Sequence, residues 1–236
     1  MTLQEIIDQS SNIVFFGGAG VSTESGIPDF RSADGLYNQR YSYPPEEILS
    51  HEFFYENTAE FYRFYQDKML CLDAEPNAAH IALAKLEASG KLKAVITQNI
   101  DGLHQGAGSK NVYELHGSVH RNYCTRCNSF FSAEYVKAQQ GIPYCENCGG
   151  LVKPDVVLYG EGLDNETVSG AVGAISECDC LIVAGTSLAV QPAAGLVRYF
   201  SGSHLVLINK SATPLDSAAD LVIRDKVGEV LGNIKI

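Results

Sequence analysis

Four of the seven cysteines form two Cys-x-x-Cys pairs, which are Cys124 with Cys127 and Cys145 with Cys148. Thiolates at this spacing are typical ligands of the zinc ion in a zinc ribbon. Asn128 after the first pair, and Gly149 and Gly150 after the second, predict a tight turn at each pair. Because four protein ligands fill a tetrahedral site, this zinc is expected to stabilise the fold and to do no chemistry. A redox pair or buried thiols are the alternatives, which the paired spacing disfavours.

A glycine-rich segment, Gly17 to Ser22, follows the apolar run 13–16. Glycines at the end of a strand permit a sharp turn and let a helix N-terminus approach a pyrophosphate, so the segment predicts a nucleotide site. Thr23 stands where the third glycine of Gly-x-Gly-x-x-Gly would fall. The segment alone therefore leaves a plain turn open as the alternative.

Polar side chains follow two further apolar runs. Asn99 and Asp101 come after residues 94–97, and His116 comes directly after residues 112–115. In α/β proteins, residues at the carboxyl ends of strands contact ligands. An imidazole with a pKa of about 6.5 is mostly neutral in neutral solution and can accept a proton. The structural alternatives are a packed or capping histidine, and helix capping or turn formation by Asn99 and Asp101.

The remaining candidate ligands are expected to be structural. His80 lies near the start of a predicted helix and His104 on a short helical turn, so both fit packed histidines. Cys71, Cys178 and Cys180 show no ligand spacing and are expected to be small buried side chains.

Short apolar runs predict the strands that position these residues, at 13–16, 94–97, 156–159, 181–184 and 205–208. Their near-continuous apolar character is typical of strands buried on both faces. Helical periodicity between them predicts helices at 78–88, 166–175 and 193–200. Alternating strands and helices predict an α/β fold with a doubly wound, Rossmann-like parallel sheet.

Two stretches interrupt this alternation and predict a smaller second domain. Residues 31–75 are expected to form a cofactor-binding loop and a helical insertion, and residues 120–151 a zinc-ribbon module. The Rossmann-like nucleotide-binding domain is then discontinuous, at 1–30, 76–119 and 152–236.

Composition excludes several classes of protein. With 236 residues, 45% of them hydrophobic, the chain can bury a core without disulfides. No apolar stretch approaches the roughly 18 residues of a membrane span. A net charge of −11 disfavours direct binding of nucleic acid and favours basic peptides as partners. The acidic N-terminal segment lacks the charge of a signal peptide, so the protein is expected to be cytoplasmic.

Residues 18–31, GAGVSTESGIPDFR, closely resemble the signature of the sirtuins, the Sir2-type NAD-dependent protein deacylases. Further matches follow in order, TQNIDGLH at 97–104, ELHG at 114–117, PDVVLYGE at 154–161, GTSL at 185–188 and IN at 208–209. The chain is thereby identified as a member of this family, of the compact bacterial type with a zinc ribbon. Tyr159 and Gly162 depart from the usual Phe and larger residue in a segment that borders the peptide groove of sirtuins. These departures bear on substrate preference rather than on reaction type.

The resemblance implies an NAD-dependent protein-lysine deacetylase. The acetyl oxygen of the acyl-lysine attacks the ribose carbon that held nicotinamide, nicotinamide leaves, and an alkylamidate forms. A general base then activates a ribose hydroxyl, and the acyl group passes to ADP-ribose. His116 matches the base, and Asn99 and Asp101 match the residues that hold the nicotinamide pocket and the ribose.

The resemblance also implies the residues that bind NAD alongside Asn99, Asp101 and His116. They are Gly18, Ala19, Gly20, Thr23, Asp29, Phe30, Arg31, Gln98, Ile100, Gly185, Thr186, Ser187, Asn209, Lys210 and Val227. Arg31 is expected to meet a phosphate, and Phe30 to shield the reactive sugar carbon from water and returning nicotinamide.

An acyl-lysine peptide is expected to add a strand between residues 157–161 and 187–190. Its implied contacts are Val157, Leu158, Tyr159, Gly160, Glu161, Leu188 and Val190. Because this mode reads the main chain, selectivity for side chains should be modest. Sirtuins that remove succinyl groups carry Tyr-x-x-Arg where this chain has YRFY at 62–65. An uncharged acyl group is therefore expected, acetyl first. Phe53, Phe61 and Leu70 could border longer apolar chains, but an aromatic stripe of this kind more often forms core.

Three other functions stay open. A protein ADP-ribosyltransferase would use the same NAD site, and an NAD-dependent oxidoreductase would use the same fold. Asn209 and Lys210 replace the acidic residue with which such an oxidoreductase reads ribose. A non-catalytic NAD-sensing or zinc-scaffold protein would not need the intact set of His116, Asn99 and Asp101. The sequence names neither the substrate protein nor the oligomeric state, and a monomer is possible.

Overall fold

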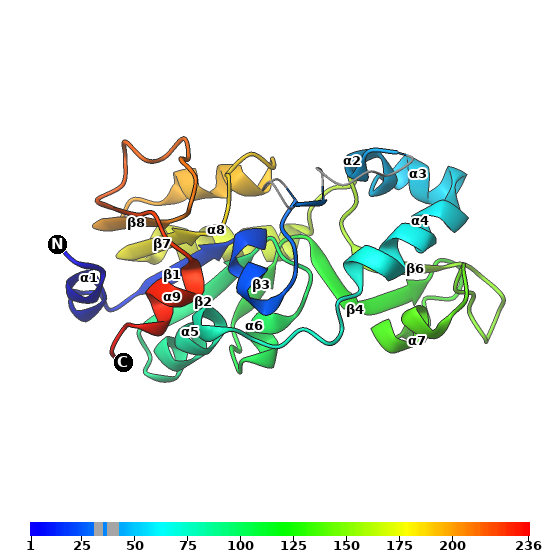
Figure 1. Cartoon of the computed structure of the whole chain (residues 1–236), viewed down its shortest axis with the longest axis horizontal. Helices are drawn as coiled ribbons and strands as arrows, with labels where there is room; N and C mark the ends of the chain where they lie inside the picture. The colour runs from blue at the N-terminus through cyan, green and yellow to red at the C-terminus, as the bar shows by residue number, and fades with distance from the viewer. Residues whose placement is uncertain (31–34, 37–42) are drawn as a thin grey trace.

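The computed structural model describes residues 1–30, 35–36 and 43–236, so Arg31 lies outside the described residues. Two sheets lie at opposite ends of an elongated molecule, and both termini lie at the end that holds the larger sheet (Figure 1). Among the described residues, none of the helices combines the length and apolar character of a membrane span.

The larger sheet has six strands, and every neighbouring pair is parallel. Its order is β3 (Val112–Glu114), β2 (Leu92–Thr97), β1 (Ile13–Gly17), β7 (Cys180–Ala184), β8 (His204–Ile208) and β9 (Leu221–Ile223). The two central strands, β1 and β7, are buried along their whole length. The strand order reverses between them, which makes this boundary the switch point where ligands bind in such folds. The predicted doubly wound parallel sheet is confirmed.

Helices cover both faces of this sheet. Helices α1 (Leu3–Gln9), α5 (Ala78–Ala88) and α9 (Val227–Gly232) pack against the face that carries Ile13 and Phe15. Helix α8 (Asn165–Glu177) and the 3₁₀ helix η5 (Ala193–Tyr199) pack against Val14 and Phe16 on the other face. Successive side chains of β1 point to opposite faces of the sheet, so this strand contributes to two hydrophobic cores. All three predicted helices are present, the last as a 3₁₀ helix.

The smaller sheet is antiparallel, with the order β5 (Phe130–Phe131), β4 (Gly117–Cys124) and β6 (Val152–Val156). The helices of this lobe are α2 (Pro45–Ile48), α3 (His51–Glu56), α4 (Thr58–Phe64), which continues as the π-helical turn η4 (Tyr65–Met69), and α7 (Ala133–Ala138). Side chains from α3 and α4 share one core with Val136 and Cys145 of the cysteine segment. The predicted domain boundaries stay a prediction.

The predicted parallel strand at 156–159 is wrong. Val156 is the last residue of β6 and pairs antiparallel with Gly117. The chain then continues as an extended segment, in which Tyr159 forms an isolated bridge with Ser50. An apolar run reports burial, and it does not say which sheet the run joins.

Candidate active site

A cleft of about 810 Å³ lies at the carboxyl ends of the large sheet and reaches the small lobe. Predicted NAD and peptide residues from the whole chain line it: Gly18, Ala19, Gly20, Thr23, Asp29, Phe30, Gln98, Asn99, Ile100, Asp101, His116, Val157, Leu158, Tyr159, Gly160, Glu161, Gly185, Thr186, Ser187, Val190, Asn209, Lys210 and Val227. Leu188 does not line the cleft, because a left-handed backbone (φ 54°) turns its side chain into the core.

Two glycine loops cross at the switch point. The amide of Gly20 donates to the carbonyl of Gly185 at 2.8 Å. A Cβ on Gly20 would lie 2.8 Å from the Gly185 Cα, and one on Gly185 would lie 2.5 Å from the Val21 nitrogen. Gly185 also has a φ of 58°, which L side chains avoid. The glycines therefore let the loops after β1 and β7 pack together as one floor of the cleft, which suits the close approach of a dinucleotide.

A hydrogen-bonded network fixes the polar side chains after β2. The Ser22 hydroxyl donates to Asp101 Oδ2 at 2.7 Å, and Asn99 Nδ2 donates to the Ser22 oxygen at 3.0 Å. The other carboxylate oxygen of Asp101 accepts from the Leu103 amide at the start of helix α6 (Leu103–Gly106). Asp101 thus caps a helix and faces the cleft. Sequence analysis did not single out Ser22, although it stands inside the GAGVS motif.

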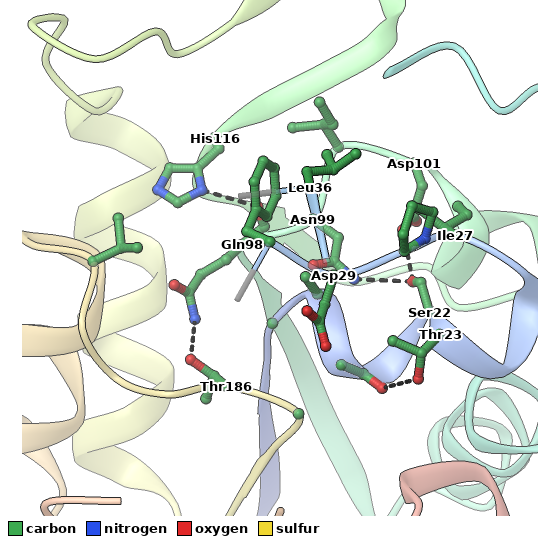
Figure 2. Close-up of a pocket in the computed structure, with 18 of the residues that line it drawn as sticks. Ser22, Thr23, Ile27, Asp29, Leu36, Gln98, Asn99, Asp101, His116 and Thr186 are labelled. Atoms are coloured by element: carbon green, nitrogen blue, oxygen red, sulfur yellow. Dashed lines mark hydrogen bonds between the residues drawn. The ribbon is translucent and has the colours of Figure 1, made fainter. Parts of the chain in front are cut away.

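His116 is held in the tautomer that a general base needs. Its Nδ1 lies 2.9 Å from the Gln98 carbonyl oxygen, and Figure 2 shows the two residues side by side. A carbonyl only accepts, so Nδ1 carries the hydrogen and Nε2 keeps a free lone pair. Burial lowers the pKa of His116, and the bond to Gln98 opposes that shift in part. The ring is therefore neutral in neutral solution.

The extended segment 157–161 is tied to the small lobe along one edge. The Tyr159 amide donates to Leu49, and the His51 amide donates to Tyr159. Glu161 accepts from His51 Nδ1 at 2.8 Å and from Lys153 Nζ at 3.1 Å. Burial raises the pKa of Glu161, but these hydrogen bonds and charges lower it overall, so the group is a carboxylate. Glu161 anchors the segment through contacts that residue spacing could not reveal.

The aromatic stripe forms core, the alternative that the sequence favoured, whereas the prediction of a buried Cys71 is wrong. Phe53, Phe61 and Leu70 are buried in the core of the small lobe and do not line the cleft. Cys71, in contrast, is half-buried and does line it. Burial raises the pKa of the Cys71 thiol, so it stays protonated. Cys178 and Cys180 are buried as predicted.

The four paired cysteines form one cluster in the small lobe, with every pair of sulfurs within 4.8 Å. Cys124 Sγ lies 3.5 Å from Cys148 Sγ, and Cys127 Sγ lies 3.5 Å from Cys145 Sγ. Tetrahedral zinc with Zn–S bonds of about 2.3 Å separates its sulfurs by about 3.8 Å, so the cluster fits one zinc ion. The predicted turns are present, with positive φ at Asn128 (58°) and Gly149 (69°). None of the four cysteines lines the cleft, which agrees with a structural metal.

The sequence profile of the Sir2 family matches residues 18–192. The chain belongs to the Sir2 family. Two relatives are each named NAD-dependent protein deacetylase. The one from Clostridium acetobutylicum is 63% identical over 235 residues, which cover 98% of this chain and 96% of the relative. The one from Clostridium perfringens is 60% identical with the same coverage.

A solved Sir2 structure with a deacetylated p53 peptide and 3′-O-acetyl ADP-ribose superposes on this Sir2 chain with a TM-score of 0.88. The two are 42% identical, and the match covers 97% of this chain and 94% of the other. The predicted family and the predicted fold are therefore confirmed.

Proposed function

We propose that this Sir2 protein is an NAD-dependent protein-lysine deacetylase, which passes the acetyl group of lysine to ADP-ribose and releases nicotinamide. One observation carries the proposal: a neutral imidazole, His116, shares a cleft with the fixed network of Ser22, Asn99 and Asp101. The name shared by relatives at 63% and 60% identity agrees with this activity. The acetylated ADP-ribose in the solved Sir2 structure favours deacetylation over ADP-ribosylation of protein.

The residues of the cleft have different roles in this reaction. Bound NAD would supply an activated ribose carbon, a nicotinamide leaving group and ribose hydroxyls that accept the acyl group. His116 Nε2 takes the proton of a ribose hydroxyl, since its Nδ1 is engaged by Gln98. Asn99 and Asp101 orient the nicotinamide and ribose through side chains that Ser22 holds in place.

The ends of β7 and β8 would hold the adenosine half, with Ser187, Asn209 and Lys210 on the cleft wall and Val227 at the start of α9. Gln98 Nε2 donates to Thr186 Oγ1 at 3.1 Å and so links the segment after β2 to the loop after β7. Asp29 and Phe30 line the cleft beside the network, where they would cover the reactive sugar carbon. A phosphate contact by Arg31 stays part of this proposal.

The acyl-lysine peptide would lie between segments 157–161 and 187–190. Tyr159 is paired with Leu49 and His51 on one side, so a peptide must approach from the other. Across the cleft, the backbone groups of Ser187 and Ala189 form no hydrogen bond with any described residue. Unpaired N–H and C=O groups at an edge can pair with an added strand.

The partners and the compartment of the protein are inferred from its charge and composition. A protein with a net charge of −11 suits acetyl-lysine proteins in the cytoplasm rather than nucleic acid or a membrane surface. One structural zinc ion would hold the small lobe.

The test is to incubate the protein with NAD and an acetyl-lysine peptide and to weigh all products. Deacetylation predicts a peptide lighter by one acetyl group, together with acetylated ADP-ribose and nicotinamide. A peptide heavier by one ADP-ribose would support transferase activity instead, and absorbance of reduced nicotinamide would support an oxidoreductase.

A further inference from the structure

A second hollow continues from the active-site cleft past Tyr159. It measures about 530 Å³, and its walls are Glu46 and Glu47 of α2 and the segment Ala189–Gln191. Tyr159, Val190 and Gln191 line both hollows, so the second is an extension of the first. The extension lies where the proposed peptide path leaves the cleft, and we call it the α2 groove.

The charge of the α2 groove has one sign. Of the six described residues that line it, two are carboxylates and none is basic. Glu46 has an interaction of its own. The exposed Glu47 side chain forms no hydrogen bond or ion pair with a described residue. The side chains of Lys153 and His51 are both engaged by Glu161. Within the described part of the chain, no direct contact therefore compensates the negative charge of Glu47 where a substrate residue would pass.

We propose that Glu47 makes the enzyme prefer acyl-lysine peptides in which a lysine or arginine flanks the acylated lysine. The proposal rests on the peptide path described above. Successive side chains of an added strand point to opposite sides, so a residue adjacent to the acyl-lysine projects away from the cleft, toward the α2 groove, while the acyl-lysine enters the cleft. Main-chain hydrogen bonds bind every peptide alike, and the Glu47 carboxylate distinguishes peptides by the charge of the flanking residue. A solvent-exposed pair of this kind changes affinity by about two- to fivefold.

The experiment compares three acetyl-lysine peptides of one length, flanked by lysine, by glutamine or by glutamate. Wild type is measured beside Glu47→Gln, Glu47→Lys and the control Glu56→Lys. Glu56 is an exposed residue of α3 outside the α2 groove, and its replacement changes the net charge of the protein by the same amount as Glu47→Lys. Turnover of the glutamine-flanked peptide reports whether each variant is folded and active.

For wild type we expect KM to be lowest for the lysine-flanked peptide, by about threefold. Glu47→Gln should make the three KM values equal, and Glu47→Lys should reverse their order, with kcat nearly unchanged. Glu56→Lys should keep the wild-type order. Equal KM values in wild type, or a wild-type order in both Glu47 variants, would overturn the role of Glu47. An equal shift in Glu56→Lys would also overturn it, because overall charge would then be the cause. If wild type deacetylates none of the peptides, the proposed function itself fails and this inference falls with it.

Discussion

The imidazole rings of His80 and His104 lie edge to face, with 4.7 Å between their centroids. Both side chains are buried, and three of their four ring nitrogens have no hydrogen-bond partner among the described residues. Burial lowers the pKa of His80 and lowers that of His104 to about 3. Both rings are therefore neutral packing groups of α5 and α6, as sequence analysis expected.

This pair should make the protein acid-sensitive. Below a pH of about 6.5 the unfolded chain binds protons that the folded chain excludes, so the free energy of unfolding falls as the pH drops. His104 should contribute a slope of about 1.4 kcal/mol per pH unit, down to a pH of about 3. His104→Leu should flatten the acid side of the stability curve measured by urea unfolding. Equal slopes in the variant and in wild type would contradict the assignment.

The pH dependence of catalysis should follow His116. Burial lowers the pKa of His116 in the free enzyme, so the base stays unprotonated, and kcat/KM should hold until the pH falls below about 6.5. The check is a profile of kcat/KM against pH for deacetylation, in a range where circular dichroism shows the protein folded. An acid limb with its midpoint above the ordinary histidine value would refute a buried neutral base.

Ser22→Ala should lower activity by disturbing the hydrogen-bonded network while the protein stays folded. The substitution leaves Asn99 and Asp101 without their shared partner, and the loss at the buried Asn99 amide costs about 1–3 kcal/mol. We expect kcat/KM for deacetylation to fall about tenfold or more. The matched control is Ser89→Ala, because the Ser89 hydroxyl donates to the Leu86 carbonyl at the end of α5 and to no other described residue. Equal activity in the two variants would show that the network positions nothing.

Removal of zinc should unfold the small lobe. Cys124 and Cys145 belong to the same core as the aromatic residues of α3 and α4. Closed thiolate sites contribute about 10–16 kcal/mol to folding. Chelation or Cys145→Ser should therefore abolish zinc content, lower the melting temperature and end deacetylation. Cys178→Ala, at a buried cysteine outside the cluster, should keep the metal. Folded and active protein without zinc would contradict a structural role.

Local patterns were enough to predict much of the fold. Continuous apolar residues locate β1, and helical periodicity locates α5, whose cap Asn77 accepts from the Ala79 amide. Cysteine spacing alone located the metal cluster. In each case the stabilising contacts lie close together in sequence or follow a fixed spacing.

The errors and the features that the sequence left open have a common cause, since each depends on contacts between distant parts of the chain. Residues 156–159 are apolar in either sheet, and only pairing with Gly117 and Ser50 decides their place. Phe53 and Phe61 face a core that the cysteine segment completes. Ser22 and Glu161 owe their roles to partners many residues away.

The most direct measurement counts nicotinamide and acetylated ADP-ribose for each acetyl group removed from a peptide, in wild type and in His116→Ala. We predict one molecule of each product for every lysine deacetylated by wild type, and loss of both deacetylation and acetylated ADP-ribose in the variant. Deacetylation without consumption of NAD, or unchanged turnover by His116→Ala, would contradict the account.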